Sequence, residues 1–231
     1  MNDQVALDIA TKVIEQIFGY KNPYSLEQVR QKFAFDVRLP NKVFDTTTNE
    51  ETWAQSTNPS KFITFNNYIE EVKKTDWVKP KKPLNSLEDI LVAWNEINYT
   101  ATERQIECVN IMKCDNVYNS ENLYQSQDVH YCKNVLFSDV LRRSEYVIAS
   151  QRSHSCTYAM RIEDSKECTK SFGVSWSAKV SNSFMIHNAY DISDCMFCSH
   201  VSSKRFCIAN MQYTEEEYYK VRDMVIRWIL S

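Results

Sequence analysis

Small and slim residues recur with a period of twelve in the second half of this chain. Written in blocks of twelve from Cys108, eight successive blocks align, and their first, fourth, seventh and tenth positions are always Cys, Ser, Ala, Val, Ile or Leu. Those six residue types make up about two in five residues of an average protein, so 32 consecutive matches are not chance. The blocks begin at Cys108, Ser120, Cys132, Ser144, Cys156, Cys168, Val180 and Ile192.

This repeat predicts a β-solenoid with twelve residues per coil. Such a coil is too narrow for large side chains, so its inward positions must be small or slim. Coils stacked about 4.8 Å apart share ladder hydrogen bonds, and eight of them would form a rod roughly 38 Å long. Inward serines are tolerated because a hydroxyl can bond a carbonyl of its own or the next coil. Since Gly173 is the only glycine there, we expect Asn, Asp and Ser to take the left-handed corners.

The first 105 residues follow a different pattern, one of short mixed elements. Apolar residues at helical spacing from Val5 to Ile17 predict a helix that ends at Gly19. We also expect a capped helix from Ser25 to about Phe33, a strand over 33–39, a turn over 46–49, a helix over 68–77, an exposed linker over 79–83 and an amphipathic helix from Ser86 through Ile97.

A last helix is predicted to start at Thr214 with Glu217 and to cap the final coil. The predicted fold class is therefore α+β. It has an N-terminal mixed α/β domain (1–105), a narrow β-solenoid of 12-residue coils (106–212) and a C-terminal capping helix (213–231).

The composition excludes several function classes. The 231 residues carry a net charge of −3, and the chain is neither disordered nor broadly basic. Two glycines exclude glycine-rich phosphate loops, the dinucleotide fingerprint and the nucleophile elbow. No apolar run approaches the roughly 20 residues of a membrane helix, and no signal-peptide pattern opens the chain. We expect a cytoplasmic or virion protein without a membrane or nucleic-acid partner.

All eight cysteines fall on the inward columns. There a thiol packs as a small hydrophobe with little reactivity, and without a signal peptide a reducing compartment favours this interpretation over disulfides. One alternative stays open: a disulfide could join Cys108 to Cys114 across a coil, or Cys156 to Cys168 between coils.

A second alternative for the cysteines is a zinc site. Cys195, Cys198 and Cys207 lie close in sequence to His187 and His200. Both histidines are predicted to face outward, away from the cysteines. We therefore expect the protein to bind no metal and no cofactor.

Two resemblances appear in the solenoid region. The spacing Cys-x-x-Ser-x-x-Cys-x-x-Ala resembles the twelve-residue coils of the beetle antifreeze solenoid, whose intracoil cysteine pair matches Cys108 and Cys114, over residues 108 to about 207. The resemblance implies the fold but not ice binding, because mixed charges replace the family's Thr-x-Thr array. Around Cys195, Cys198 and Cys207 the chain resembles the ending of uncharacterised cysteine-repeat proteins of tailed bacteriophages and small-genome bacteria, a family that implies no activity.

The fifth, outward position of each block is large and apolar. This apolar stripe consists of Met112, Tyr124, Leu136, Ile148, Met160, Phe172, Phe184, Met196 and Ile208. Soluble monomers do not expose contiguous apolar surface of that size, so something must cover it. Either residues 1–105 fold back over it, or a partner or second copy binds it; Met160, Phe172, Phe184 and Met196 are the candidate partner-binding residues.

A basic ridge is the other candidate surface. The eleventh column contains His130, Arg142, His154 and Lys166, with Arg143 and Arg152 beside it. Arg142 and Arg143 are candidates to meet phosphate or carboxylate groups; the alternative is an ordinary solvated face.

These patterns favour a non-enzymatic structural or interaction protein, with a protein partner or self-association. The phage-like ending favours a virion or assembly component that uses the solenoid as a rigid scaffold. The alternatives are a cellular adaptor that recognises a ligand through the stripe or the ridge and, third, a solenoid enzyme. No serine or cysteine has a base and an orienting group at a usable spacing.

Overall fold

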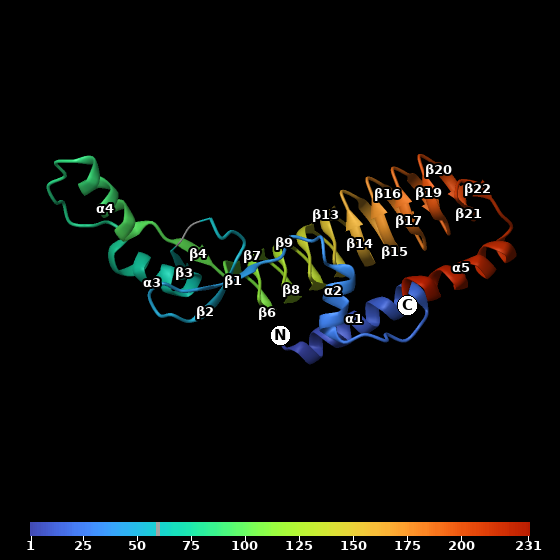
Figure 1. Ribbon diagram of the computed structural model, residues 1–231, viewed down its shortest axis with the longest axis horizontal. Coiled ribbons are helices and arrows are strands. Elements are labelled where there is room, and N and C mark those ends of the chain that lie inside the picture. The colour runs from blue at the N-terminus through green and yellow to red at the C-terminus, as the bar shows by residue number, and fades with distance from the viewer. Residues whose placement is uncertain (59–60) are drawn as a thin grey trace.

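The computed structural model describes residues 1–58 and 61–231; Pro59, one of the five prolines, lies outside the described residues. A rod of stacked coils runs through the molecule, with helices along one side and a small α/β unit at one end (Figure 1). The helices are α1 (Asp3–Phe18), α2 (Leu26–Phe33), α3 (Phe65–Thr75), α4 (Leu87–Ile97) and α5 (Glu215–Ile229). The α/β unit contains β1 (Asn41–Phe44), β2 (Glu51–Ala54), β3 (Phe62–Thr64) and β4 (Thr100–Thr102).

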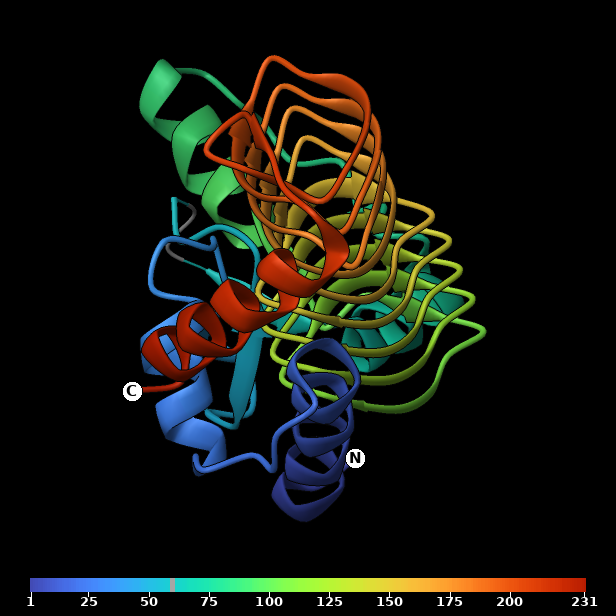
Figure 2. The same cartoon turned by 90° about the vertical axis from the view of Figure 1, so that its right-hand side faces the viewer.

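The predicted solenoid is confirmed, with about nine turns. Most coils hold two four-residue strands joined by two-residue corners, and each strand pairs in parallel with the strand twelve residues on, as Val109 does with Glu121. The strands are β5 (Gln105–Ile106), β6 (Val109–Met112), β7 (Asp115–Tyr118), β8 (Glu121–Tyr124), β9 (Gln127–His130), β10 (Lys133–Leu136), β11 (Asp139–Arg142), β12 (Glu145–Ile148), β13 (Gln151–His154), β14 (Thr157–Glu163), β15 (Lys166–Ser175), β16 (Ala178–Ser181), β17 (Phe184–His187), β18 (Tyr190–Ser193), β19 (Met196–Ser199), β20 (Ser202–Arg205), β21 (Cys207–Ile208) and β22 (Met211–Gln212). Figure 2 shows the coils stacked on one another.

The inward columns form a core inside the coils. Every predicted inward position is buried except Cys108, Ile111 and Val201, which lie in the end coils and are partly exposed. Serine and cysteine side chains make the same kind of hydrogen bonds there. Ser138 Oγ donates to Leu136 O (2.8 Å) and accepts from Ser150 N (3.2 Å), and Cys132 Sγ donates to His130 O (3.2 Å) and accepts from Ser144 N (3.3 Å). Several of these hydroxyls and thiols, such as those of Ser138 and Cys132, thereby tie their own coil to the next.

A left-handed residue occurs at every third position from Glu107 to Ala209, with φ between about 45° and 67°. Asn, Asp and Ser fill many of these positions, as predicted, but so do Val140, Phe137 and Trp176. The prediction was too narrow because coil-to-coil hydrogen bonds hold the backbone in this conformation. Phe137 N, for example, donates to Tyr124 O at 3.0 Å. Proline, which lacks that N–H, is absent from this region of the sequence.

A second core lies outside the coils, between the apolar stripe and three helices. Helices α1, α2 and α5 pack on the stripe, and the views of the rod show them on one side of it (Figures 1 and 2). Phe18 of α1 is central, with its ring centroid 5.4 Å from that of Phe172 and 5.6 Å from that of Phe184. The C-terminal helix is present as predicted and covers the stripe of the last coils. It does not cover β20 at the end of the stack, whose four residues are all exposed.

One of the predictions for the N-terminal region is wrong. The capping boxes at Ser25 and Ser86 and the left-handed Gly19 are confirmed. The strand over 33–39 is wrong: α2 runs through Phe33, a turn follows, and the strand begins only at Asn41, after Pro40. Of the alternating residues, Phe33 is buried and Val37 and Leu39 are partly buried against the second core, whereas Phe35 is 72% exposed.

Residues 41–58 and 61–102 form the α/β unit against the first coils. β1 and β2 make an antiparallel hairpin, β3 pairs in parallel with β4, and α3 follows β3. The unit is joined to the solenoid by Asp115, which is 2% exposed, accepts from Gln55 N at 2.8 Å and pairs with Arg104 at 2.9 Å. The described helices include none with the length and apolar character that a membrane crossing needs.

Candidate functional site

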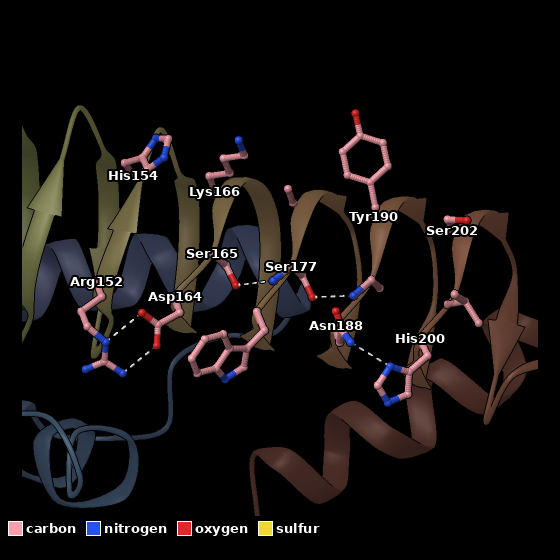
Figure 3. Close-up of a pocket in the computed structure, with 14 residues that line it drawn as sticks. Arg152, His154, Asp164, Ser165, Lys166, Ser177, Asn188, Tyr190, His200 and Ser202 are labelled. Carbon is pink, nitrogen blue, oxygen red and sulfur yellow. Dashed lines mark hydrogen bonds and ion pairs between the residues drawn. The ribbon is translucent and has the colours of Figure 1, made fainter.

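An open groove of about 750 Å³ runs along the C-terminal half of the rod. We call it the axial groove (Figure 3). One wall carries Arg152, Asp164, Trp176, Asn188 and His200, the other carries His154, Lys166, Ala178, Tyr190 and Ser202, and the floor is Ser165, Ser177, Ala189 and Val201.

The twelve-residue repeat explains how this groove arises. Its walls are the ninth and eleventh columns, and its floor is the inward tenth column, whose small side chains turn away from the surface. The ladder brings the eleventh-column residues side by side: Lys166 pairs with Ala178, and Ala178 with Tyr190. Because Ala178 is small, that wall has a gap between its two longer neighbours.

The charges of the groove are mostly paired. Arg152 forms a bidentate pair with Asp164, with both distances 2.8 Å, and also contacts Glu163. Lys166 has no ion-pair partner among the residues that the structure describes. The two carboxylates of Asp164 and Glu163 offset the two positive charges of Arg152 and Lys166.

Two aromatic rings and several polar atoms face solvent in the groove. Trp176 is 61% exposed and Tyr190 is 49% exposed, on opposite walls. Asn188 Nδ2 pairs with His200 Nδ1 at 2.8 Å. Asn188 Oδ1 and His200 Nε2 have no hydrogen-bond partner within the described part of the chain.

The basic ridge exists as a column, but its charge is compensated. Arg142 contacts Asp128 at 3.1 Å, and the same carboxylate contacts His130 at 3.1 Å. Burial and the nearby Arg142 lower the pKa of His130, which favours its neutral form. Arg143 is exposed at a corner. The ridge therefore presents little net positive charge at Arg142.

The four stripe residues named as partner-binding candidates lie inside the molecule. Met160, Phe184 and Met196 are 0% exposed and Phe172 is 4% exposed, all beneath the helices. The chain itself covers the stripe, as one of the two expected arrangements had it, so these residues form an internal interface and are not an accessible partner surface. Of residues 1–105, the helices that cover it are α1 and α2, and α5 shares the task.

The cysteines are free thiols, and all but Cys108 are buried. Burial raises the pKa of Cys114 to about 12 and that of Cys132 to about 11, so these thiols stay protonated and inert at neutral pH. Residues 1–58 and 61–231 contain no group of three or more His, Cys, Asp or Glu side chains placed to hold a metal ion.

A second exposed surface was missed at the level of sequence. Helix α4 was predicted as amphipathic, but none of its residues is buried, and with the preceding segment it projects from the end of the molecule (Figure 1). We call residues 78–97 the α4 arm. Leu87, Leu91 and Trp94 are 69%, 55% and 55% exposed. A groove of about 380 Å³ separates the helix from residues 79–84.

Neither a scan against models of protein families nor a search of curated proteins found a match to this chain. Two exposed surfaces, the axial groove and the α4 arm, are the candidate functional sites.

Proposed function

We propose that this protein is a non-enzymatic assembly component, a rigid solenoid rod that associates with a second copy of itself through the α4 arm. The observation that carries the proposal is an amphipathic helix at one end of the rod with no buried residue. A helix of eleven residues is marginal alone in water and gains its stability from packing of its apolar face.

The distribution of charge in the arm favours a second copy as the occupant. Acidic Glu88 lies in the first turn of α4. Lys79 and Lys81 line the groove beside the helix, and the neighbouring Lys82 pairs with Glu96 of the last turn at 2.9 Å. In an antiparallel pair related by a twofold axis, the acidic first turn of each helix would meet the lysines of the other copy. The same contact is made twice, and the exposed apolar residues of both helices are buried between them.

The rest of the molecule supports a scaffold role. The interior of the coils is filled with side chains, the buried thiols of Cys114 and Cys132 are protonated, and the charges of the groove walls are largely paired. None of these features supplies an activated nucleophile with a base. The narrower role in a phage particle is supported by the resemblance of the C-terminal cysteine motif.

The self-association is tested by sedimentation equilibrium at about 50 µM, where a micromolar dimer is populated. Leu91→Glu should convert dimer to monomer, because it places a charge in the apolar interface. The matched control is Met224→Glu, which changes an apolar residue on helix α5 that is slightly more exposed (64%) than Leu91 (55%) and should leave the dimer intact.

A charge exchange tests the geometry. Lys81→Glu and Glu88→Lys should each weaken the dimer, and an equimolar mixture of the two variants should restore it, because only unlike pairs then face each other. A monomeric wild type at this concentration, or a mixture that stays monomeric, would contradict the proposal; an arm that binds a different protein instead would favour the adaptor.

A further inference from the structure

The axial groove combines features that no part of the assembly proposal uses. It is long and open, it follows the rod axis over several coils, and its two exposed rings lie on opposite walls at Trp176 and Tyr190. Between and beside the rings are planar polar side chains, the amide of Asn188 and the imidazole of His200. The groove thus offers flat apolar faces next to hydrogen-bonding edges.

An extended peptide does not match this surface. Peptides that lie along a sheet bind through its free backbone groups, but in the coils beneath the groove those groups are used by the neighbouring coils. Ala178 N donates to Ala189 O and Lys166 N to Ser177 O, both at 3.1 Å. The floor serines are also occupied: Ser177 Oγ donates to Ser175 O and accepts from Ala189 N.

A polyanion does not match it either. Nucleic-acid strands need a groove with a clear excess of positive charge. Here the bidentate contact of Asp164 with Arg152 and the nearby Glu163 remove that excess, leaving Lys166. A neutral chain with both apolar faces and many hydroxyls fits better, because aromatic rings cover C–H faces while amide, imidazole and ammonium groups bind hydroxyls.

We propose that the axial groove binds a neutral oligosaccharide, with sugar rings lying on Trp176 and Tyr190 and hydroxyls bound by Asn188, His200 and Lys166. The paired Arg152 and Asp164 hold each other in fixed positions at one end, so the polar edge there is preorganised. The ligand would run along the rod, crossing one coil after another.

The proposal is tested by calorimetric titration of the full chain with four neutral hexasaccharides: maltohexaose, cellohexaose, mannohexaose and chitohexaose. At least one should bind, and Trp176→Asn should weaken it about tenfold or more, since a stacked ring is lost. Asn is chosen because the chain itself places Asn116 and Asn188 in the same column with left-handed φ of 59° and 48°. Trp176→Tyr, which keeps a ring, should retain most of the affinity.

The control is Tyr131→Ala, which removes a ring of similar exposure (60%) outside the groove and should not alter binding. Failure of all four sugars to bind at millimolar concentration, or equal binding by the folded Trp176→Asn variant, would overturn the proposal. Salt-sensitive binding of a twelve-nucleotide oligo(dT), without sugar binding, would assign the groove to nucleic acid instead. The Leu91→Glu variant should bind sugar normally, so the groove and the α4 arm are tested separately.

Discussion

The rod has two hydrophobic cores that share the backbone of one strand layer and differ in kind. The core inside the coils is built from Cys, Val, Ile, Leu, Ala and Ser, repeated every twelve residues. The core outside the coils is built from Phe, Tyr, Met and the apolar faces of three helices. The inner core must fit each coil, so its residues are restricted in size at every repeat. The outer core forms once, by packing that has no period.

This difference indicates which interactions stabilise the rod. A coil buries little apolar surface by itself, and its slim residues stack only on those of the adjacent coils. Of these two cores, only the outer one contains aromatic side chains, which bury the most area per residue. The helices are therefore part of the folding unit of the solenoid.

The largest expected effect comes from breaking the outer core at its centre. Phe18→Ala removes a ring that is 1% exposed and contacts both Phe172 and Phe184. We expect a loss of about 3–5 kcal/mol in the free energy of unfolding, measured by urea denaturation, with new binding of a hydrophobic dye to the uncovered stripe.

The matched control for this change is Phe35→Ala, since Phe35 is 72% exposed. It should cost less than about 1 kcal/mol. Equal losses for the two variants, or a Phe18→Ala protein as stable as wild type, would show that α1 only rests on a solenoid that is stable without it.

The inner core was predictable from sequence and the outer core was only half so. A narrow coil admits only small or slim residues at its inward positions, and this restriction recurs every twelve residues. The repeat therefore predicted the inward columns directly. The stripe was predicted to need a cover, but no periodicity says which helix meets it. Phe18 and Tyr218 take that place through tertiary packing of segments far apart in sequence.

A smaller effect is expected inside the coils, where chemistry matters more than volume. Ser138→Ala removes the oxygen that accepts from Ser150 N and donates to Leu136 O, and should cost about 1–3 kcal/mol by urea denaturation because a buried N–H loses its partner. Ser138→Cys should cost less than about 1 kcal/mol. Cys132 already makes the corresponding pair of contacts, with Ser144 N at 3.3 Å and His130 O at 3.2 Å.

A Ser138→Ala protein as stable as wild type would show that the hydroxyl contributes nothing as a link between coils. A Ser138→Cys protein as destabilised as Ser138→Ala would show that a thiol cannot replace the hydroxyl at this position.

The two proposed binding surfaces were only partly predictable from the sequence. The ninth and eleventh columns could be written out from the repeat, and Trp176 and Tyr190 would have appeared in adjacent coils on either side of a small column. The sequence did not predict the ion pairs. The pairing of Arg142 with Asp128, and of Arg152 with Asp164, depends on which side-chain rotamers come together across adjacent coils. The α4 arm was missed because an amphipathic pattern predicts burial and does not say what provides it.

The smallest effect concerns the eighth column of the repeat, which contains two buried acids two coils apart, Asp115 and Asp139. Replacing each by Asn should change the free energy of unfolding in opposite directions. Asp139 is 7% exposed, and its Oδ1 has no hydrogen-bond partner among the described residues. Burial raises the pKa of Asp139 above that of the unfolded chain. The folded state therefore holds this proton more tightly, and the stability that it confers at low pH is lost as pH rises through the folded pKa.

Asp139→Asn should accordingly raise the free energy of unfolding at pH 7, by less than about 1 kcal/mol, and leave it nearly unchanged near pH 3, where the native carboxyl is already neutral. Asp115→Asn is the control in the same column. It should lower stability at pH 7 by about 1–3 kcal/mol, because it leaves the half-buried Arg104 without its carboxylate. Thermal melts at the two pH values measure both. A destabilised Asp139→Asn protein at pH 7 would mean that the carboxylate has a partner, and that this column, like the serine column, is held together by bonds between coils.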